Sequence, residues 1–237
     1  FGQIKPKVLF TANGYWFKGK SLDSIERISD ILKQLPSIEK IVVVPYTDQD
    51  PDISGIPNAI HFRDFESPDS NLEIEFEQLP FEHPLYIMYS SGTTGLPKCM
   101  VQSAGGILIH QLKELMLHTD LKREDTIFYF TTCGWMMWNW LTSSLGVGAS
   151  LMLFDGNPFH PNPGALWKMA QDEKITIFGT SAGYIAALQN AGVKPGKEFD
   201  LTPLKAILST GSPLSVEGFE FIYEEVKNDL QLASISG

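Results

Sequence analysis

The chain has 237 residues, of which 43% are hydrophobic, and a formal net charge of −10 at pH 7. A chain of this length and apolar content can bury a sizeable core, which predicts a globular protein of one large domain or two smaller lobes. The acidic balance, without a cluster of lysine and arginine, argues against nonspecific binding to nucleic acid. No recognisable pattern in the sequence indicates the oligomeric state.

The ends and the cysteines of the chain bear on its location in the cell. The first residues, Phe1-Gly2-Gln3-Ile4, do not resemble a signal peptide, and Cys99 and Cys133 lack the spacing of a metal site. Two such cysteines fit a reducing compartment, so the cytoplasm is the expected location. Residues 126–154 carry no charge, but polar residues and glycines interrupt them. They are predicted to form a buried strand, helix and strand and not a membrane span.

Short β-branched or aromatic runs alternate with helical patterns along the chain. A strand is expected at 8–11, a helix at 21–35 after a serine cap, and a buried strand at 41–44. Residues 47–80 are rich in Asp, Pro, Ser and Glu, a composition typical of a loop that connects two lobes. We therefore expect lobes at 1–82 and 83–237. Beyond it, strands are predicted at 85–89, 126–131, 150–154, 175–178 and 206–209, and helices at 104–118, 135–145, 163–171, 184–190 and 216–226.

This alternation predicts an α/β fold with a mainly parallel sheet flanked by helices. In such folds ligands bind at the carboxyl ends of the strands. The segment after the predicted strand 85–89 is therefore placed where a ligand would bind.

That segment is the most informative part of the sequence, Tyr89-Ser90-Ser91-Gly92-Thr93-Thr94-Gly95-Leu96-Pro97-Lys98. Its glycines let the backbone approach an anion, its hydroxyl groups add hydrogen-bond donors, and Lys98 adds a positive charge. No Asp or Glu occurs from His83 to Lys113, although the chain carries 28 acidic residues. An acid-free window is what a polyanion needs on an acidic protein, so the segment predicts a loop that holds a nucleoside triphosphate.

Two other interpretations of this loop can be weighed. The common P-loop, G-x-x-x-x-G-K-[ST], is absent, because Leu96-Pro97 precedes the lysine and Cys99 stands where the Ser or Thr magnesium ligand would be. An ordinary turn rich in Ser, Gly and Thr is the simpler alternative, but such turns are rarely this dense in hydroxyl groups.

A second motif, Gly179-Thr180-Ser181-Ala182-Gly183, matches the G-x-S-x-G of a nucleophile elbow. In α/β-hydrolases an acid and then a histidine follow the serine along the chain. The histidines here are His61, His83, His110, His118 and His160, so none follows Ser181. We interpret the motif as a tight turn from a strand into a helix, which would line a pocket.

At this point the residues carry a family resemblance that covers the whole chain. Residues Tyr89 to Lys98 resemble the phosphate loop of the adenylate-forming enzymes, which include acyl-CoA synthetases, luciferases and the adenylation domains of peptide synthetases. Thr131-Thr132-Cys133-Gly134-Trp135 resembles the family segment that walls the acyl pocket, and Leu208-Ser209-Thr210-Gly211-Ser212-Pro213-Leu214 resembles its nucleotide-binding turn.

The resemblance implies part of the large N-terminal domain of such an enzyme, and a two-step ligation. A carboxylate attacks the α-phosphate of Mg-ATP to give an acyl-adenylate and pyrophosphate, and the thiol of coenzyme A then displaces AMP. Substrates and cofactors would be a small acid, ATP, Mg²⁺ and coenzyme A. Lys98 and Thr94 would be the catalytic residues. The nucleotide would contact Ser90, Ser91, Gly92, Thr93, Thr94, Gly95, Lys98, Gly211, Ser212 and Pro213, and the acyl group would contact Trp135, Met136, Met137 and Thr210. The alternative for Trp135 and the methionines is that they belong to the core.

The sequence also departs from the family pattern. Cys99 replaces the glycine that commonly ends the loop, and Gln102 stands where relatives often have a histidine. The chain stops at Ser234-Ile235-Ser236-Gly237, where the family's next motif would begin. Most magnesium ligands, the ribose-binding aspartate, the hinge and the C-terminal catalytic domain with its lysine would then lie beyond residue 237. The resemblance thus implies a fragment that cannot complete catalysis alone.

Three hypotheses of different classes follow: part of an acid:CoA ligase, a noncatalytic nucleotide-binding module, or a hydrolase. The absence of a histidine after Ser181 counts against the hydrolase. The segment that resembles an acyl-pocket wall favours the ligase, because a simple nucleotide binder needs no acyl pocket. A wall of Trp and Met suits a short, mostly apolar acid, with acetate and propionate among the alternatives.

Overall fold

The computed structural model describes residues 1–69, 71–90 and 95–236. Contacts within the chain divide it into two compact units, Phe1–Phe76 with Asp155–Pro161, and Glu77–Phe154 with Asn162–Gly237. The short segment Asp155–Pro161 packs on the first unit although the chain on either side of it belongs to the second. The division of the chain into domains at 1–82 and 83–237 stays a prediction.

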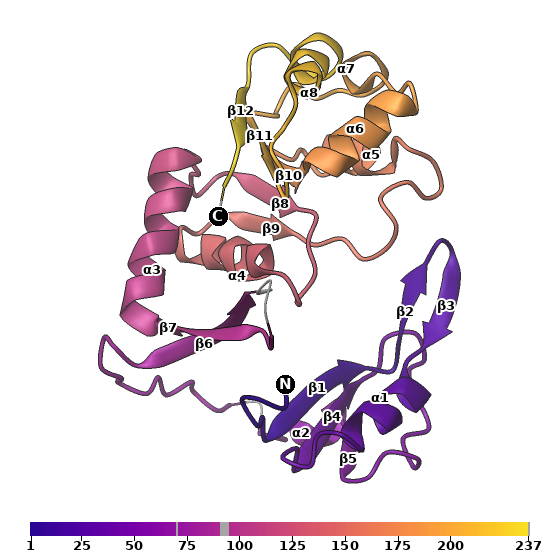
Figure 1. Ribbon diagram of the computed structural model, residues 1–237, viewed down its shortest axis with the longest axis vertical. Coiled ribbons are helices and arrows are strands. Elements are labelled where there is room, and N and C mark those ends of the chain that lie inside the picture. The colour runs from indigo at the N-terminus through magenta and orange to yellow at the C-terminus, as the bar shows by residue number, and fades with distance from the viewer. Residues whose placement is uncertain (70, 91–94, 237) are drawn as a thin grey trace. The chain divides into compact units, whose positions relative to one another are not determined.

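The first unit is built on a small parallel sheet in the order β1 (Val8–Ala12), β4 (Lys40–Val44) and β5 (Ala59–His61) (Figure 1). Helix α1 (Ile25–Leu32) covers one face of this sheet, where Ile28 packs with Ile41 and Val43. The short helix α2 (Phe62–Phe65) follows β5, and the ring of Phe65 lies 5.2 Å from that of Phe10, edge to face. The hairpin of β2 (Gly14–Phe17) and β3 (Lys20–Asp23) completes the unit.

Two details of the first unit differ from the sequence prediction. The helix expected at 21–35 begins only at Ile25, since residues 20–23 form β3, and its first amide is bound by Asp23 Oδ1 at 2.7 Å and not by a serine. The stretch 47–80, expected to be a connection, contains β5 and α2. Pairing with β4 explains β5, because a partner strand can order a segment of weak intrinsic preference.

One hydrogen bond shows how the segment Asp155–Pro161 is held by the first unit. The hydroxyl of Tyr46 donates to Asp155 Oδ2 at 2.8 Å. This hydrogen bond to the carboxylate, with a smaller contribution from burial, raises the pKa of Tyr46, so the hydroxyl keeps its proton and remains a donor at neutral pH.

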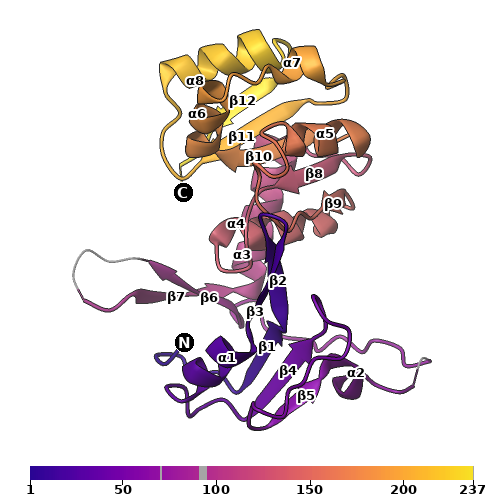
Figure 2. The same ribbon diagram turned by 90° about the vertical axis from the view of Figure 1, so that its right-hand side faces the viewer.

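The second unit contains a larger parallel sheet in the order β12-β11-β10-β8-β9 (Figures 1 and 2). Its strands are β8 (Thr126–Tyr129), β9 (Ser150–Met152), β10 (Ile177–Ser181), β11 (Ala206–Thr210) and β12 (Gln231–Ser234). The α/β class with parallel strands flanked by helices is confirmed. Strand β12 is an addition to the predicted elements.

Helices lie on both faces of this sheet (Figures 1 and 2). On one side are α3 (Ala104–Lys113), which continues as a π-helical turn, Glu114–His118, and α4 (Met136–Thr142), which continues as a 3₁₀ turn, Ser143–Gly146. On the other are α5 (Ala165–Asp172), α6 (Ala182–Asn190), α7 (Pro195–Glu198) and α8 (Val216–Phe221), which ends in a second π-helical turn, Ile222–Val226. The sheet is thereby buried on both faces, as parallel sheets require.

Alternate residues of the strands fill the two halves of the core. Ile127, Ile177 and Leu208 face the side of α4, where they pack with Trp140 and Leu141. Phe178 faces the opposite side and stacks on Trp167 of α5, with ring centroids 4.5 Å apart. The uncharged stretch 126–154 forms β8, α4 and β9 of this core, as predicted, and no helix among the described residues is long and apolar enough to cross a membrane.

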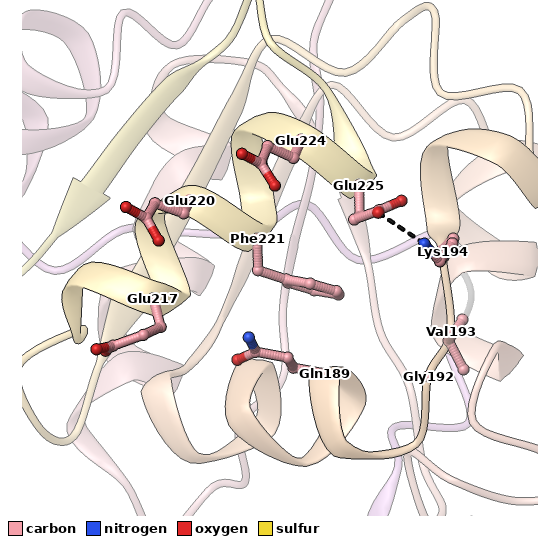
Figure 3. A pocket seen from close by; sticks show the side chains of 9 residues that line it. All are labelled: Gln189, Gly192, Val193, Lys194, Glu217, Glu220, Phe221, Glu224 and Glu225. Carbon is pink, nitrogen blue, oxygen red and sulfur yellow. Dashed lines mark hydrogen bonds and ion pairs between the residues drawn. The ribbon is translucent and has the colours of Figure 1, made fainter.

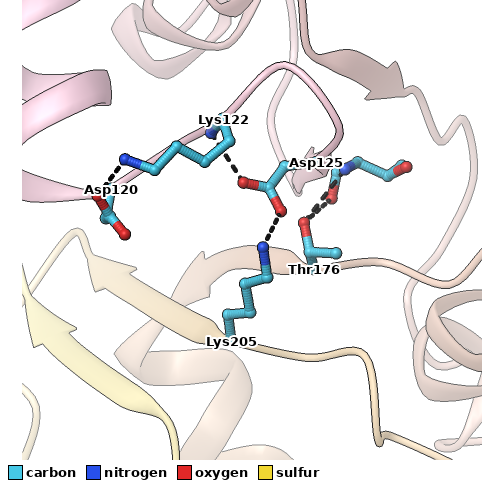
Figure 4. Close-up of polar contacts among 6 residues, drawn as sticks. Asp120, Lys122, Asp125, Thr176 and Lys205 are labelled. Atoms are coloured by element: carbon cyan, nitrogen blue, oxygen red, sulfur yellow. Dashed lines mark hydrogen bonds and ion pairs between the residues drawn. The ribbon is translucent and has the colours of Figure 1, made fainter.

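Polar contacts, centred on the buried carboxylate of Asp125, connect the amino ends of the strands (Figure 4). Asp125, only 1% exposed, accepts hydrogen bonds from Lys205 Nζ at 2.7 Å and from the amide of Lys122 at 2.8 Å. Thr176 Oγ1 binds the amide and the carbonyl of Thr126, each at 3.1 Å. These contacts join the starts of β8, β10 and β11, and we call this end of the sheet the amino edge.

Burial and hydrogen bonding act in opposite directions on the carboxyl group of Asp125. Burial by itself would raise its pKa, but the hydrogen bonds, of which that from Lys205 contributes most, together outweigh burial. The pKa of Asp125 therefore lies below its ordinary value, and the side chain is a carboxylate at neutral pH.

Candidate active site

The loops that follow the strands of the larger sheet gather at the opposite end, which we call the carboxyl edge. Because the strands are parallel, residues 130–135 after β8, 182–183 after β10, 211–213 after β11 and 235 after β12 all emerge there. This edge brings together two of the three segments that resemble the family, 131–135 and 208–214, and the G-x-S-x-G turn.

The turn after β11 presents its backbone to solvent. Thr210, the last residue of β11, lies opposite Ser181 in register, and its hydroxyl donates to the carbonyl of Ile235 at 2.9 Å. Gly211 has φ +90°, a conformation that favours glycine, and Gly211, Ser212 and Pro213 are exposed. A Cβ at Gly211 would lie 3.9 Å from that of Ser181, so this turn is next to the G-x-S-x-G turn.

Two further hydrogen bonds hold the turn in place. The amide of Leu214 donates to Ser234 Oγ at 3.2 Å, and the amide of Ile235 donates to the carbonyl of Ser209 at 2.7 Å. Strand β12, which sequence reasoning did not predict, therefore supports the predicted nucleotide-binding turn from one side.

The G-x-S-x-G motif is a strand-to-helix turn, as the sequence predicts. Ser181 ends β10 in an extended conformation, with φ −112° and ψ 154°, and caps α6: its Oγ accepts a hydrogen bond from the amide of Tyr184 at 3.2 Å. Capping is a common structural task for serine at this position of a helix. The hydroxyl thus has a structural role that requires no catalytic partner.

The predicted acyl-pocket residues divide into two groups. Trp135 and Met136, at the start of α4, are 38% and 37% exposed at the carboxyl edge. Met137, in contrast, is 6% exposed and packs in the core with Trp140 and Leu141. The position of Met137 fits the core alternative, while Trp135 and Met136 are open to a ligand.

Sequence reasoning missed Tyr129, the last residue of β8, which connects these segments. Its ring lies 6.2 Å from that of Trp135, edge to face, and its hydroxyl donates to the carbonyl of Thr180 at 3.2 Å. A tyrosine at the end of a buried strand carries no signal by itself, because the contacts arise from strand order.

The phosphate loop lies in a different setting from the one predicted. It connects β6 (Pro84–Ser90) to β7 (Lys98–Ser103), which pair as an antiparallel hairpin apart from the larger sheet. The loop therefore does not follow a strand of the parallel sheet, and that expectation was wrong. The error arose because 98–103 was not recognised as a strand; its order comes from pairing with β6.

The described part of the loop, residues 95–97, is exposed to solvent. Ser90 lies opposite Lys98 in register, Lys98 is exposed, and Gly95 has φ +89° with no atom of the described residues within 4 Å of an added Cβ. Ser91, Gly92, Thr93 and Thr94 lie outside the described residues. Of the described hydrogen bonds and ion pairs, none joins Ser90 or Lys98 to the carboxyl edge.

A hollow elsewhere in the second unit is unsuited to a phosphate. It has a volume of about 340 Å³ and lies between the end of α6 and the exposed side of α8 (Figure 3). Four glutamates line it, Glu217, Glu220, Glu224 and Glu225, and Lys194 pairs with Glu225 at 2.8 Å. Carboxylates repel a polyanion, so the acid-free hairpin and the carboxyl edge remain the candidates for ATP.

Metal-binding side chains do not cluster in the described ranges. No group of three or more His, Cys, Asp or Glu side chains there is arranged to hold a metal ion. Cys99 lies in β7 and Cys133 in the loop after β8, both exposed.

Comparisons with known proteins identify the family to which the chain belongs. A family profile described as AMP-binding enzyme matches residues 1–234. The chain is 48% identical over 241 residues to acetoacetyl-CoA synthetase of Danio rerio, covering 99% of this chain and 36% of the relative. It is also 48% identical over 238 residues to acetoacetyl-coenzyme A synthetase of Rhizobium meliloti (strain 1021), covering 100% of this chain and 36% of that protein.

A solved structure shows the same fold. Acetoacetyl-CoA synthetase from Streptomyces lividans superimposes with a TM-score of 0.89 at 41% identity, over 99% of this chain and 36% of the other. The chain thus spans about a third of the length of these proteins. Since the profile covers nearly all of its residues, the chain belongs to the AMP-binding enzyme family.

Proposed function

We propose that this chain carries the ATP- and acid-binding part of an acetoacetate–CoA ligase. The observation that carries the proposal is its similarity, from end to end, to acetoacetyl-CoA synthetases. Three segments resemble the amino-acid sequence of that enzyme: Gly134-Trp135-Met136-Met137-Trp138-Asn139, Phe154-Asp155-Gly156-Asn157-Pro158 and Ser209-Thr210-Gly211-Ser212-Pro213. In the proposed reaction acetoacetate and ATP give acetoacetyl-AMP and pyrophosphate, and coenzyme A then gives acetoacetyl-CoA and AMP.

The geometry of the carboxyl edge supports roles for the nucleotide and the acid. Gly211, Ser212 and Pro213 are exposed, and the positive φ of Gly211 leaves the backbone open to the adenosine. Trp135, Met136 and Thr210 would border the acyl group. Met137 would act from the core behind them, because it is only 6% exposed.

The hairpin supports a role in neutralising phosphate charge. Ser90, Gly95 and Lys98, together with Ser91, Gly92, Thr93 and Thr94 outside the described residues, would bind the β- and γ-phosphates as pyrophosphate leaves. The window from 83 to 113 contains no carboxylate that would repel them. Magnesium would accompany ATP, and coenzyme A would be the second substrate. We propose the cytoplasm as the location; the oligomeric state is left open.

The proposal is tested by ATP–pyrophosphate exchange in a full-length protein that contains this sequence. Acetoacetate, acetate, propionate, butyrate and 3-hydroxybutyrate are offered separately. Exchange that depends chiefly on acetoacetate is expected. Exchange with another of these acids would retain the ligase and replace its substrate, and ATP binding without exchange for any acid would favour a noncatalytic nucleotide-binding module.

Lys98→Gln tests the hairpin in the same assay. Loss of its charge should lower kcat for exchange by about tenfold to a hundredfold, with a smaller effect on the affinity for acid. The matched control is Lys168→Gln, which removes an exposed lysine paired with Asp172 at 2.7 Å. Equal rates for Lys98→Gln and the control would remove Lys98 from the mechanism.

A further inference from the structure

Tyr129 occupies an unusual position beneath the candidate site. It is 2% exposed, at the carboxyl end of β8, and belongs to the core on the side of α4. Its ring meets those of Trp135 at 6.2 Å and Trp140 at 6.0 Å, each edge to face. Trp140 is buried, whereas Trp135 is partly exposed, so Tyr129 connects the exposed tryptophan to the fixed core.

A glycine on the neighbouring strand makes room for this ring. A Cβ at Gly179 of β10 would lie 2.0 Å from Tyr129 Cδ2 and 2.4 Å from Cε2, distances at which atoms overlap. The absence of a side chain at Gly179 lets the ring of Tyr129 lie against β10, where its hydroxyl contacts the carbonyl of Thr180. The first glycine of the G-x-S-x-G motif is therefore explained by packing and not by a nucleophile.

The hydroxyl of Tyr129 contacts the other side of the candidate site. It donates to the carbonyl of Thr180 at 3.2 Å, one residue before Ser181, which lies beside Gly211. Burial raises the pKa of Tyr129, so the hydroxyl stays protonated and remains a donor over the working range of pH.

We propose that Tyr129 is a positioning residue that sets both walls of the site, with its ring holding Trp135 on the acid side and its hydroxyl holding the Thr180–Ser181 turn on the nucleotide side. The inference rests on the proposed function for the identity of the two substrates. The two parts of the side chain have separable tasks. Removing the hydroxyl should affect the nucleotide, and removing the ring should affect both substrates.

The test compares Tyr129→Phe and Tyr129→Leu in the full-length protein. Tyr129→Phe should weaken ATP binding about threefold or more while the KM for acid stays within about twofold. Tyr129→Leu should raise the KM for acid about fivefold or more and weaken ATP binding as well. Restoration of the acid KM by phenylalanine, relative to leucine, separates the ring from the hydroxyl.

A readout without catalysis tests the same geometry. Cys133 is exposed, two residues before Trp135, and its alkylation rate can be followed by peptide mapping. Tyr129→Leu should speed this alkylation about threefold or more, because the loop loses its support, while Tyr129→Phe leaves it unchanged. Calorimetry with ATP gives the nucleotide affinity independently of turnover.

The outcomes are distinguishable. Wild-type alkylation of Cys133 in Tyr129→Leu, or unchanged ATP affinity in Tyr129→Phe, would overturn the corresponding half of the inference. If the wild-type protein catalyses no exchange, the proposed function fails, but the alkylation rate and the ATP affinity still decide whether Tyr129 positions the two walls. If Tyr129→Leu does not fold, Tyr129→Phe still decides the role of the hydroxyl. Trp135→Ala is then measured in the same alkylation assay. Wild-type alkylation of Cys133 in that variant would show that Trp135 does not order the loop, and would overturn the role of the Tyr129 ring.

Discussion

The two ends of the larger sheet use polar residues in opposite ways. At the amino edge, Asp125 accepts a hydrogen bond from Lys205 at 2.7 Å, and Thr176 binds the backbone of Thr126 at 3.1 Å, so that the starts of β8, β10 and β11 are connected. At the carboxyl edge, Gly211, Ser212 and Pro213 are exposed, and the buried hydroxyls of Thr180 and Ser209 have no hydrogen-bond partner among the described residues. The same strands thus provide stability at one end and an accessible surface at the other.

We therefore expect that a substitution at the amino edge changes stability without changing the candidate site, and that a substitution in the exposed turn at the carboxyl edge changes binding with little effect on stability. Removing a buried carboxylate that has hydrogen-bond partners lowers the free energy of unfolding strongly, whereas a substitution in an exposed turn lowers it little. Substitutions at the two ends should therefore have different effects when the free energy of unfolding and the affinity for ATP are both measured.

The largest expected effect is at the amino edge. Asp125→Ala leaves Lys205 and the amide of Lys122 without their acceptor, and should lower the free energy of unfolding by about 2 kcal/mol. Hydrogen exchange of the amides in β8 and β10 measures this loss. ATP affinity should change less than about twofold.

A surface carboxylate is the control for this change. Asp172→Ala breaks an exposed pair with Lys168 and should cost less than about 1 kcal/mol. Equal losses for the two variants would mean that the buried network contributes no more than a surface ion pair.

The next effect is at the carboxyl edge. Gly211→Ala forces a side chain into a conformation with φ +90° and should weaken ATP binding about tenfold, because the turn must move. Titration calorimetry measures the affinity.

Another glycine of positive φ provides the matched comparison. Gly192 has φ +70°, no atom of the described residues lies within 4 Å of an added Cβ, and it lies between α6 and α7. Gly192→Ala should carry a similar backbone strain while ATP affinity stays at the wild-type value. A loss of affinity in both variants would point to a general weakening of the fold.

A smaller effect is expected at Ser181. Ser181→Ala removes the cap of α6 and should reduce stability by about 1 kcal/mol. Ser215→Ala, which removes the corresponding cap of α8 at 3.1 Å, should reduce it by the same amount. Both are measured by hydrogen exchange of the helix amides. Complete loss of exchange activity in Ser181→Ala alone would show that its hydroxyl takes part in the chemistry.

The smallest effect is the pH dependence of the amino edge. The pKa of Asp125 is lower in the folded protein than in the unfolded chain, so the unfolded state takes up the proton first as the pH falls. Its contribution to stability is therefore present above about pH 4 and is lost below it. The difference in unfolding free energy between wild type and Asp125→Asn should shrink from about pH 5 to about pH 3, and a constant difference would contradict the shift.

Much of the second unit could be predicted because its strands and helices are strongly patterned. The runs at 126–131, 175–178 and 206–209 each gave a strand, and the helices after them followed from apolar spacing. Strands β7 and β12 could not be predicted in this way. Both are ordered by a neighbour, β6 or β11, and not by a pattern of their own.

The candidate site was predicted unevenly for the same reason. We could predict Lys98, Trp135 and Gly211 as candidate site residues because they lie in distinctive sequence motifs. Their surroundings could not be inferred, since the antiparallel pairing of the phosphate hairpin and the burial of Met137 depend on packing between distant segments.

The α/β class and the family could be inferred from the sequence alone, because both depend on local patterns of hydroxyl, glycine and apolar residues. Which distant residues contact one another is known from the three-dimensional structure. Tyr129 reaches Thr180 because β8 lies beside β10 and Gly179 lacks a side chain, and Asp125 reaches Lys205 across 80 positions of the chain. Contacts of this kind arise from strand order and packing, which no local pattern records.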